Sequence, residues 1–376
     1  AVARACADDN PFFAVSRLTR RVGDEAPACV IAFNDTPGDF GDRLDLGSWA
    51  DLGAVYGLAY DWSRGHLYVA AYHRVGAAPG AGGLGQIYRI DLWTGLSTAF
   101  ARLDAGTSGV GSGPGADREA SRLVGRIGLG DIDIDAAATE LLVANLHDRR
   151  VHRLRLPDGA SLPSVPFGSS DRPWSDHARP FGLGAFGAWV YQGVVELPEA
   201  GSDRSPVAHL YRSQTDGTGM SEVAAIDLGY RGTAPWSGWS EAADGPLPEP
   251  MLVDIAFRPD GTPIVGLRDR RGDAGRWVSV GDVLALSGGE GQWAAAVDPD
   301  HYADRFVADE SLLGGLAAFP GADLLVATAS MPLVPGTAGA AYLDNATGRA
   351  TGRETVAFGA AGGADAIAAL GDIEAL

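Results

Sequence analysis

Acidic side chains are the residues of this sequence best suited to chemistry. Five of them lie in short stretches where polar and apolar residues alternate: Asp131, Asp133, Asp254, Asp372 and Glu374. Alternation with a period of two is typical of β-strands. Carboxylate oxygens are the ligands that a hard cation such as Ca²⁺ prefers. If the strands bring these acids together, they form a candidate calcium site.

Two interpretations of these acids stay open. In the first, the carboxylates hold a cation, and a water molecule on that cation could serve as the nucleophile of a hydrolase. In the second, each carboxylate accepts hydrogen bonds from backbone amides near the start of its own strand, and no metal binds. The sequence favours the second interpretation slightly, because acids on different strands need not meet.

Several short motifs match the sequence patterns of known sites. The glycines at 80–85 and 182–187 match the dinucleotide fingerprint, but neither stretch joins a strand to a helix. His147 and His152 have no cysteine or third histidine nearby, unlike a zinc site. Arg271-Gly272-Asp273 spells a cell-adhesion tripeptide in an expected loop, where it is either an exposed motif or a chance match.

A repeated β unit must position the acids, and its clearest copy covers residues 130–156. Three segments with a period of two, at 131–134, 141–146 and 151–156, are separated by tight polar turns. The first strands of the other copies end at similar anchors, in order Tyr60, Ile134, Phe186, Phe257, Phe319 and Ala375. The anchors recur about every 50 to 75 residues, which suits four-stranded propeller blades with loops.

Six copies predict an all-β, six-bladed β-propeller that forms a single domain over residues 1–376, with a seven-bladed ring as the alternative. Residues 370–376 supply only a first strand, whereas 12–15 and 28–33 supply the later strands of the same blade. Pairing of the two termini would close the ring without a free sheet edge. Glycines that follow the third strands are expected to have positive φ, at Gly95, Gly159, Gly217, Gly288 and Gly348.

Composition limits the partners of the chain. The formal net charge of −19 disfavours binding to nucleic acid or to anionic lipid and favours cations. No apolar run is long enough to span a bilayer, which argues against membrane insertion. Cys6 and Cys29 lie close together in sequence and would pair as a disulfide in an exported protein, whereas two buried free thiols are the alternative.

The connections between strands differ in length on the two faces of the expected ring. Loops after the second and fourth strands of each blade emerge on one face, called here the long-loop face, and comprise 73–85, 104–126, 171–180, 196–206, 229–251, 269–279, 299–311 and 330–339. Because the first strand of each blade begins on this face, the acids are expected at the mouth of the channel there. Turns after the first and third strands form the opposite, short-turn face.

The long-loop face is the expected binding face, because elaboration on one side of a rigid scaffold usually binds something. Candidate ligand-binding residues in these loops are Trp174, His177, Trp236, Trp239, Arg271 and Trp277. Such side chains suit stacking on sugars or anchoring of a protein partner. Their alternative role is packing between the blades.

The repeated unit resembles a known module. Gly130–Ile134 with Leu141–Leu154, Asp254–Phe257 with Gly266–Arg270, and Leu370–Leu376 resemble the β-propeller at the front of large bacterial surface proteins that carry B repeats of the serine-aspartate type. The resemblance implies a secreted or cell-surface module with a binding or structural role. It implies no catalytic residues. The alternative is a cation-dependent, lactonase-like hydrolase, which uses the same fold.

Overall fold

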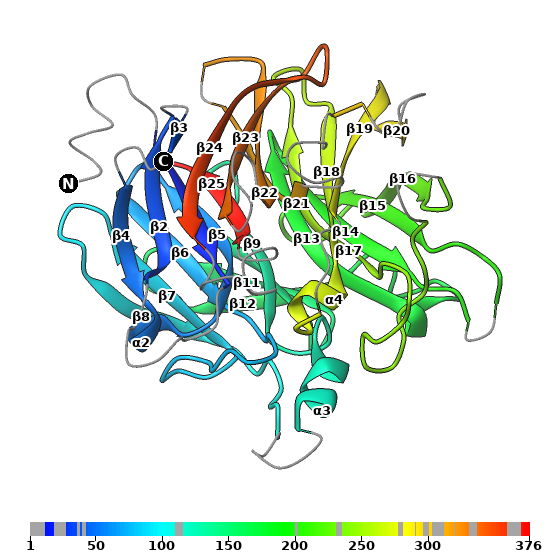
Figure 1. The fold of residues 1–376 in the computed structure, drawn as a ribbon, viewed down its shortest axis with the longest axis horizontal. Coiled ribbons are helices and arrows are strands. Elements are labelled where there is room, and N and C mark those ends of the chain that lie inside the picture. Colours follow the sequence, from blue (N-terminus) through cyan, green and yellow to red (C-terminus); the bar gives the residue numbers. More distant parts are fainter. Residues whose placement is uncertain are drawn as a thin grey trace.

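Six β-sheets form a ring in which the innermost strands of neighbouring sheets contact one another (Figure 1). The computed structural model describes residues 12–18, 28–35, 38–39, 43–109, 116–199, 202–230, 235–276, 281–289, 291–295, 301–302, 312–319, 321–330, 337–358 and 370–376. The six sheets confirm the prediction of a six-bladed propeller over the seven-bladed alternative.

Three blades come from the first half of the chain. The first comprises β5 (Val55–Asp61), β6 (His66–Ala71), β7 (Gln86–Asp91) and β8 (Ser97–Arg102). The second comprises β9 (Leu129–Ile134), β10 (Glu140–Asn145), β11 (Arg150–Arg155) and β12 (Ser161–Pro166). The third comprises β13 (Ala178–Phe186), β14 (Trp189–Glu196), β15 (Val207–Ser213) and β16 (Ser221–Asp227).

Two further blades follow in the second half. One comprises β17 (Pro250–Phe257), β18 (Pro263–Asp269), β19 (Gly281–Gly289) and β20 (Gln292–Ala295). The other comprises β21 (Leu312–Ala318), β22 (Leu324–Ser330), β23 (Thr337–Asp344) and β24 (Ala350–Phe358), with the short β3 (Gly38–Asp39) parallel to β24. The expected first and third strands of these five blades are all confirmed.

The sixth blade joins the two ends of the chain. Its order is β25 (Leu370–Ala375), β1 (Phe12–Arg17), β2 (Ala28–Asn34) and β4 (Arg43–Ser48). The register pairs Val15 with Ile373 and Ala14 with Glu374. Figure 1 shows β25, in red, among strands coloured blue. Closure of the ring by the termini, as the sequence predicts, leaves β25 with a partner on its pairing side.

The core lies between adjacent blades, because each sheet packs both of its faces against neighbours. Phe13, Val15 and Ile31 of the closing blade, for example, pack with Val326 and Tyr342 of the β21–β24 blade. Each such side chain contributes about 1.5–3 kcal/mol of burial free energy. Apolar side chains on the strands thus form contacts between blades, and the ring is stabilised as a closed set.

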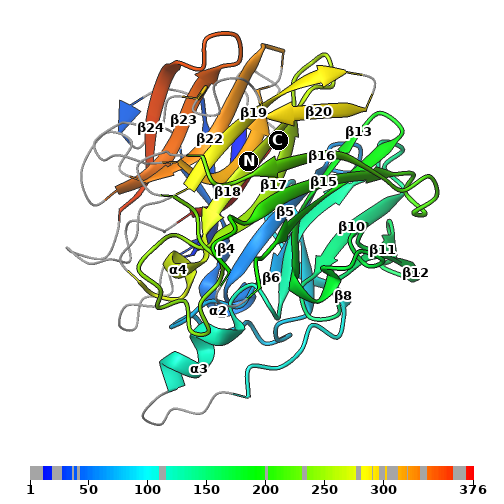
Figure 2. The same ribbon diagram turned by 90° about the vertical axis from the view of Figure 1, so that its right-hand side faces the viewer.

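Turn chemistry and loop placement follow the expectations. Gly95 and Gly159 have φ of 75° and 73°, a backbone conformation that residues with a Cβ atom rarely adopt. Gly217, Gly288 and Gly348 also have positive φ. The helices α2 (Trp49–Leu52), α3 (Ala116–Leu123) and α4 (Arg270–Asp273) and the 3₁₀ helix η2 (Ser175–His177) all lie in connections of the long-loop face. Figure 2 shows α2, α3 and α4 on one side of the ring. Among the described helices, none has the length and apolar character needed to cross a bilayer.

Candidate functional site

The five acids lie on innermost strands, as expected. Asp131 and Asp133 belong to β9, Asp254 to β17, and Asp372 and Glu374 to β25. These strands alternate around the ring with β5, β13 and β21, which carry no acid at the matching positions. The acids therefore recur on every second blade.

Three of these acids form a ring of carboxylate bridges. Each carboxylate accepts one hydrogen bond from the next amide of its own strand and one from the innermost strand of the following blade. Asp131 accepts from Leu183 N at 2.8 Å, Asp254 from Leu316 N at 2.6 Å and Asp372 from Leu58 N at 2.7 Å. The own-strand bonds come from Ile132, Ile255 and Ile373 at 2.6–2.8 Å. The carboxylates thus join neighbouring blades.

Glycine occupies the matching position on the other three strands, at Gly57, Gly182 and Gly315. A Cβ atom on Gly57 would lie 2.7 Å from Gly130 O, and one on Gly315 would lie 2.3 Å from Gly371 O. Carboxylate bridges therefore alternate with close glycine contacts around the six interfaces. The same bridge recurs at three interfaces between blades, which indicates a structural role. A catalytic base would be needed at one position only.

Two further acids, Asp133 in β9 and Glu374 in β25, lie two residues after the bridging carboxylates of the same strands. Asp133 accepts from Ala185 N at 2.5 Å and from Ile134 N at 2.6 Å. Glu374 accepts a hydrogen bond from the Tyr60 backbone. Asp133 and Glu374 are half-buried, so they lie nearer to the open end of the channel than the three bridging carboxylates.

Burial raises the pKa values of these acids. It raises the pKa of Asp372 to about 7 and that of Asp133 to about 6. Burial raises the pKa of Asp131 and Asp254 well above the usual range, and the nearby charge of Asp372 adds to both shifts. The pKa of Glu374 is also raised by burial, with Asp133 and Asp372 adding to it. Strongly shifted groups in a cavity mark a candidate site, although structural networks shift pKa values too.

The acids do not assemble into a metal-binding group. Within the part of the chain that the structure describes, no three or more His, Cys, Asp or Glu side chains are placed to hold a metal ion. Both oxygens of the bridging carboxylates already accept backbone N–H groups, as the second interpretation of these acids expects. The residues present therefore do not fit a calcium site made of these carboxylates alone.

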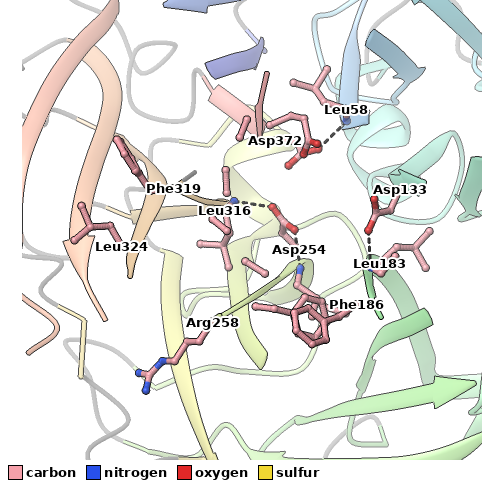
Figure 3. Close-up of a pocket in the computed structure, with 18 of the residues that line it drawn as sticks. Leu58, Asp133, Leu183, Phe186, Asp254, Arg258, Leu316, Phe319, Leu324 and Asp372 are labelled. Atoms are coloured by element: carbon pink, nitrogen blue, oxygen red, sulfur yellow. Dashed lines mark hydrogen bonds between the residues drawn. The ribbon is translucent and has the colours of Figure 1, made fainter. Parts of the chain in front are cut away.

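A cavity of about 670 Å³ occupies the channel above the carboxylates. Figure 3 shows Asp133, Asp254 and Asp372 pointing towards its centre, with Phe186, Phe319 and Arg258 around it. Its lining includes the turns at 257–259 and 321–324, which follow first strands. The cavity therefore opens on the short-turn face.

This position differs from the expected mouth on the long-loop face. At the long-loop end of the innermost strands, side chains from several blades pack into one apolar cluster: Leu18, Tyr56, Tyr72, Leu146, Phe181, Met251 and Val253. Arg268 lies beneath Tyr56 and is paired with Asp273 at 2.8 Å. These residues close the channel on that side, so the acids meet a cavity that opens on the other side.

Most of the expected ligand-binding residues of the long-loop face are occupied by packing. Trp174 stacks on His209 with ring centroids 4.4 Å apart, and Trp236 is 6 % exposed. Trp239 is half-buried and donates from Nε1 to Pro250 O at 2.8 Å. Trp236 is therefore a packing residue, whereas Trp174 and Trp239 pack on one side and keep part of their surface exposed.

The other residues of that set are Arg271, His177 and Trp277. Arg271 is buried and pairs with Asp269 at 2.8 Å, and Gly272 and Asp273 are buried too, so the adhesion tripeptide is not exposed. His177 is half-buried in η2. Trp277 lies outside the described residues.

Sequence reasoning missed the aromatic residues around the cavity and on the short-turn face. Phe186, Phe257 and Phe319 line the cavity, and all three had been identified only as strand anchors. Trp62 and Trp93 are 78 % and 63 % exposed in turns of that face. The signal that could have found them is their position directly after first and third strands, where side chains surround the short-turn end of the channel.

We expect Trp236→Ala to lower the free energy of unfolding by about 3–5 kcal/mol, as removal of a core Trp typically does. Trp236 packs among Leu228, Leu252 and Ile255. The exposed Trp62→Ala is the matched control and should leave the free energy within about 0.5 kcal/mol. Chemical denaturation of both variants measures the difference. Equal, small losses in both would show that Trp236 is not a packing residue.

Comparison with known proteins adds related sequences but no family assignment. No family model matches the chain. Colossin-A of Dictyostelium discoideum is 28% identical over 269 residues, which cover 64% of this chain and 2% of that protein. Colossin-B of the same organism is 25% identical over 309 residues, 74% of this chain and 8% of that protein. The chain thus corresponds to a small part of these relatives.

Solved structures of the same general shape are more distant in sequence. A nidogen/laminin complex structure has a TM-score of 0.47 at 13% identity, covering 97% of this chain and 98% of that one. A periplasmic gluconolactonase of Pseudomonas aeruginosa has 0.49 at 13%, covering 98% and 99%. A calcium-binding regucalcin of Agrobacterium tumefaciens has 0.43 at 13%, covering 81% and 74%. These likenesses say nothing of this chain's ligand, and the chain is a six-bladed propeller related in sequence to colossin segments.

Proposed function

We propose that this propeller is a ligand-binding module of an extracellular or cell-surface protein, and that its ligand enters the channel cavity from the short-turn face. The cavity itself carries the proposal. A preformed cavity of about 670 Å³ with an apolar wall and a few polar groups is typical of a binding site. The resemblance of the repeated unit to bacterial surface-protein propellers supports the surface role.

The lining favours a positively charged group on an apolar stem, such as a lysine side chain of a protein partner. Phe186, Phe257 and Phe319 offer apolar contact, while Asp133 and Glu374 lie half-buried along the same cavity. A cation near these carboxyls would favour their charged forms and offset the cost of burying them. Arg258 is a basic residue of the lining, and it reaches Tyr302 at 3.4 Å.

Binding of a tetralysine peptide, compared with its fully acetylated form, tests this proposal by isothermal titration calorimetry. We expect the lysine peptide to bind and the acetylated peptide to bind at least tenfold more weakly. Asp133→Asn should weaken the lysine peptide about tenfold, since a charge-assisted hydrogen bond is worth roughly 1.5–3 kcal/mol. Asp203→Asn, an exposed acid outside the cavity, controls for general attraction to an acidic protein.

Three results would contradict the proposal. One is equal affinity for the lysine and acetylated peptides, which would leave the acids without a role in recognition. Another is equal weakening by Asp133→Asn and Asp203→Asn, which would show that net charge alone attracts the peptide. A third is that neither the lysine peptide nor the acetylated peptide binds, which would also contradict the proposal.

A bound calcium ion at the five acids, expected from the sequence, is the second candidate, and it would have to replace backbone hydrogen bonds that both oxygens of the bridging carboxylates already accept. Calcium binding only to the folded ring would add about 2.7 kcal/mol of stability at a hundred times its dissociation constant. Thermal melts of chelated protein, with and without added Ca²⁺, measure this effect, and Asp254→Asn should abolish it. An unchanged melting temperature would remove both the calcium hypothesis and the lactonase-like alternative that depends on it.

Export of the protein predicts a Cys6–Cys29 disulfide. Cys29 is buried in β2, with Sγ 3.5 Å from Gly47 O, and Cys6 lies outside the described residues. A loop of this size would contribute about 3 kcal/mol in the chain-entropy model. We expect no titratable thiol in unreduced protein.

The thiol titration must be made on denatured, unreduced protein. Burial raises the pKa of the Cys29 thiol to about 12, so a reduced Cys29 would escape native-state reagents. Reduction of the same sample gives the control value of two thiols. Two thiols before reduction would rule out the disulfide and weaken the case for export.

A further inference from the structure

A second pocket, on the long-loop face, is lined by basic side chains. Its volume is about 270 Å³, and Arg126, Arg149, Arg179 and His147 contribute to its wall. The connection before β9, the β10–β11 turn and the start of β13 supply these residues. Asp176 is the acid in the lining. Such a concentration of positive charge is unexpected in a chain with a formal net charge of −19.

Two of the three arginines, Arg149 and Arg179, donate to backbone carbonyls rather than to carboxylates. Arg149 Nη1 donates to Ser175 O at 2.7 Å, and Arg179 Nη1 donates to Ala178 O at 2.7 Å and to Asp176 O at 3.1 Å. Among the described residues, none of the three has a carboxylate oxygen in salt-bridge range. Nearby arginines do pair with acids, as Arg153 does with Glu140 and Arg172 with Glu222, both at 2.7 Å.

Trp239 holds two of these guanidinium groups in place. Its ring lies 5.5 Å from the guanidinium carbon of Arg126 and 5.6 Å from that of Arg179, distances typical of cation–π contact. Arg270 contacts the same ring but is fully buried and paired with Glu249 at 2.7 Å. Arg126 and Arg179 are thus positioned by an apolar platform, and their charges stay available to a ligand.

The charges of this cluster repel one another. The pKa of Arg179 is lowered to about 9, first by burial and then by Arg126, Arg149 and Arg270. Arg179 Nε is buried without a hydrogen-bond partner. The pKa of Arg126 is lowered as well, by burial and then by Arg270. An anion in the pocket would offset this repulsion and satisfy the free donor.

We propose that this pocket binds an oxyanion, meaning a carboxylate, sulfate or phosphate group carried by a ligand of the propeller. Guanidinium groups offer paired N–H donors that match two oxygens of such a group. The pocket has room for one anionic group and the atoms next to it. This site lies on the opposite face from the channel cavity and has the opposite charge preference, so it extends the proposed function with an independent contact.

Titration with sodium sulfate, sodium phosphate and sodium acetate at constant ionic strength, set with sodium chloride, tests the proposal. Isothermal titration calorimetry should show saturable binding of one anion per chain for at least one of the three salts. Arg126→Gln and Arg149→Gln should each weaken that binding about tenfold or more. Arg102→Gln, an exposed arginine outside the pocket, should leave the affinity unchanged.

The variants are also informative about folding. Because each removes one of several like charges, Arg126→Gln and Arg149→Gln should melt at or above the parent temperature without anion. Absence of saturable binding by all three salts would overturn the proposal, as would equal weakening by Arg102→Gln. Neither outcome affects the lysine-peptide test, because the two sites share no lining residue.

Discussion

Removal of residues 370–376 is expected to abolish cooperative unfolding of the whole chain. β25 is the innermost strand of its blade, pairs with β1 and contacts β21 and β5 on either side. Its loss would expose the apolar side chains that Leu370 and Ile373 now cover and would leave two blades without a common neighbour. Circular dichroism during thermal and denaturant unfolding measures cooperativity.

Point variants of the same strand keep this prediction testable if the truncated chain is not obtained. Ile373→Asp would bury an unpaired charge and should lower stability by several kcal/mol. Ile373→Val is the matched control and should cost about 0.5–1.5 kcal/mol. A truncated chain that melts like the parent would show that the ring does not depend on closure by the C-terminus.

Stability should fall as the pH rises from about 5 to 8, and the channel acids are the reason. The folded-state pKa of Asp372 is about 7 and that of Asp133 about 6, both above the unfolded value near 4. The folded state therefore binds more protons in this range, and the stabilisation present below the unfolded pKa is lost as the pH passes the folded pKa. One pKa unit equals about 1.4 kcal/mol, and the loss for Asp372 between pH 5 and its folded pKa near 7 spans about two units, so Asp372 accounts for roughly 3 kcal/mol in this range.

The measurement is the free energy of unfolding in denaturant at pH 5 and pH 8 for the parent and for Asp372→Asn. His66 and His73 act in the opposite direction, because burial lowers their pKa values. The difference between parent and variant reports Asp372 together with its effect on the pKa values of Asp131, Asp254 and Glu374, and Asp372→Asn should show the flatter profile. Asp203→Asn should retain the parental profile. A parent that gains stability between pH 5 and 8, with Asp372→Asn unchanged from it, would contradict the prediction.

The alternation of glycine and aspartate was visible in the sequence, but its meaning was not. Gly57, Gly182 and Gly315 stand where Asp131, Asp254 and Asp372 stand in the other copies of the unit. A pattern of residue types does not say which oxygen meets which amide, because that depends on the register between strands more than 50 residues apart. The sequence therefore left capping and metal binding as alternatives.

The tryptophans show a different limit. Trp62, which is exposed, and Trp236, which is buried, both lie in connections between strands. Burial depends on what the rest of the chain places against a side chain, and loop length alone carries no such information. Loop length therefore did not separate Trp236, which packs in the core, from tryptophans that keep part of their rings exposed, and it did not reveal the basic pocket on the long-loop face.

The sequence by itself determined the number of blades, the identity of their strands and the closure by the termini. These features follow from local periodicity, turn glycines and repetition, all of which act over a few residues at a time. Tertiary structure alone decided at which end the channel opens, which acids join neighbouring blades and where arginines converge. Those outcomes depend on distances between residues remote in sequence, such as Leu58 and Asp372, which only packing of the closed ring brings within 2.7 Å.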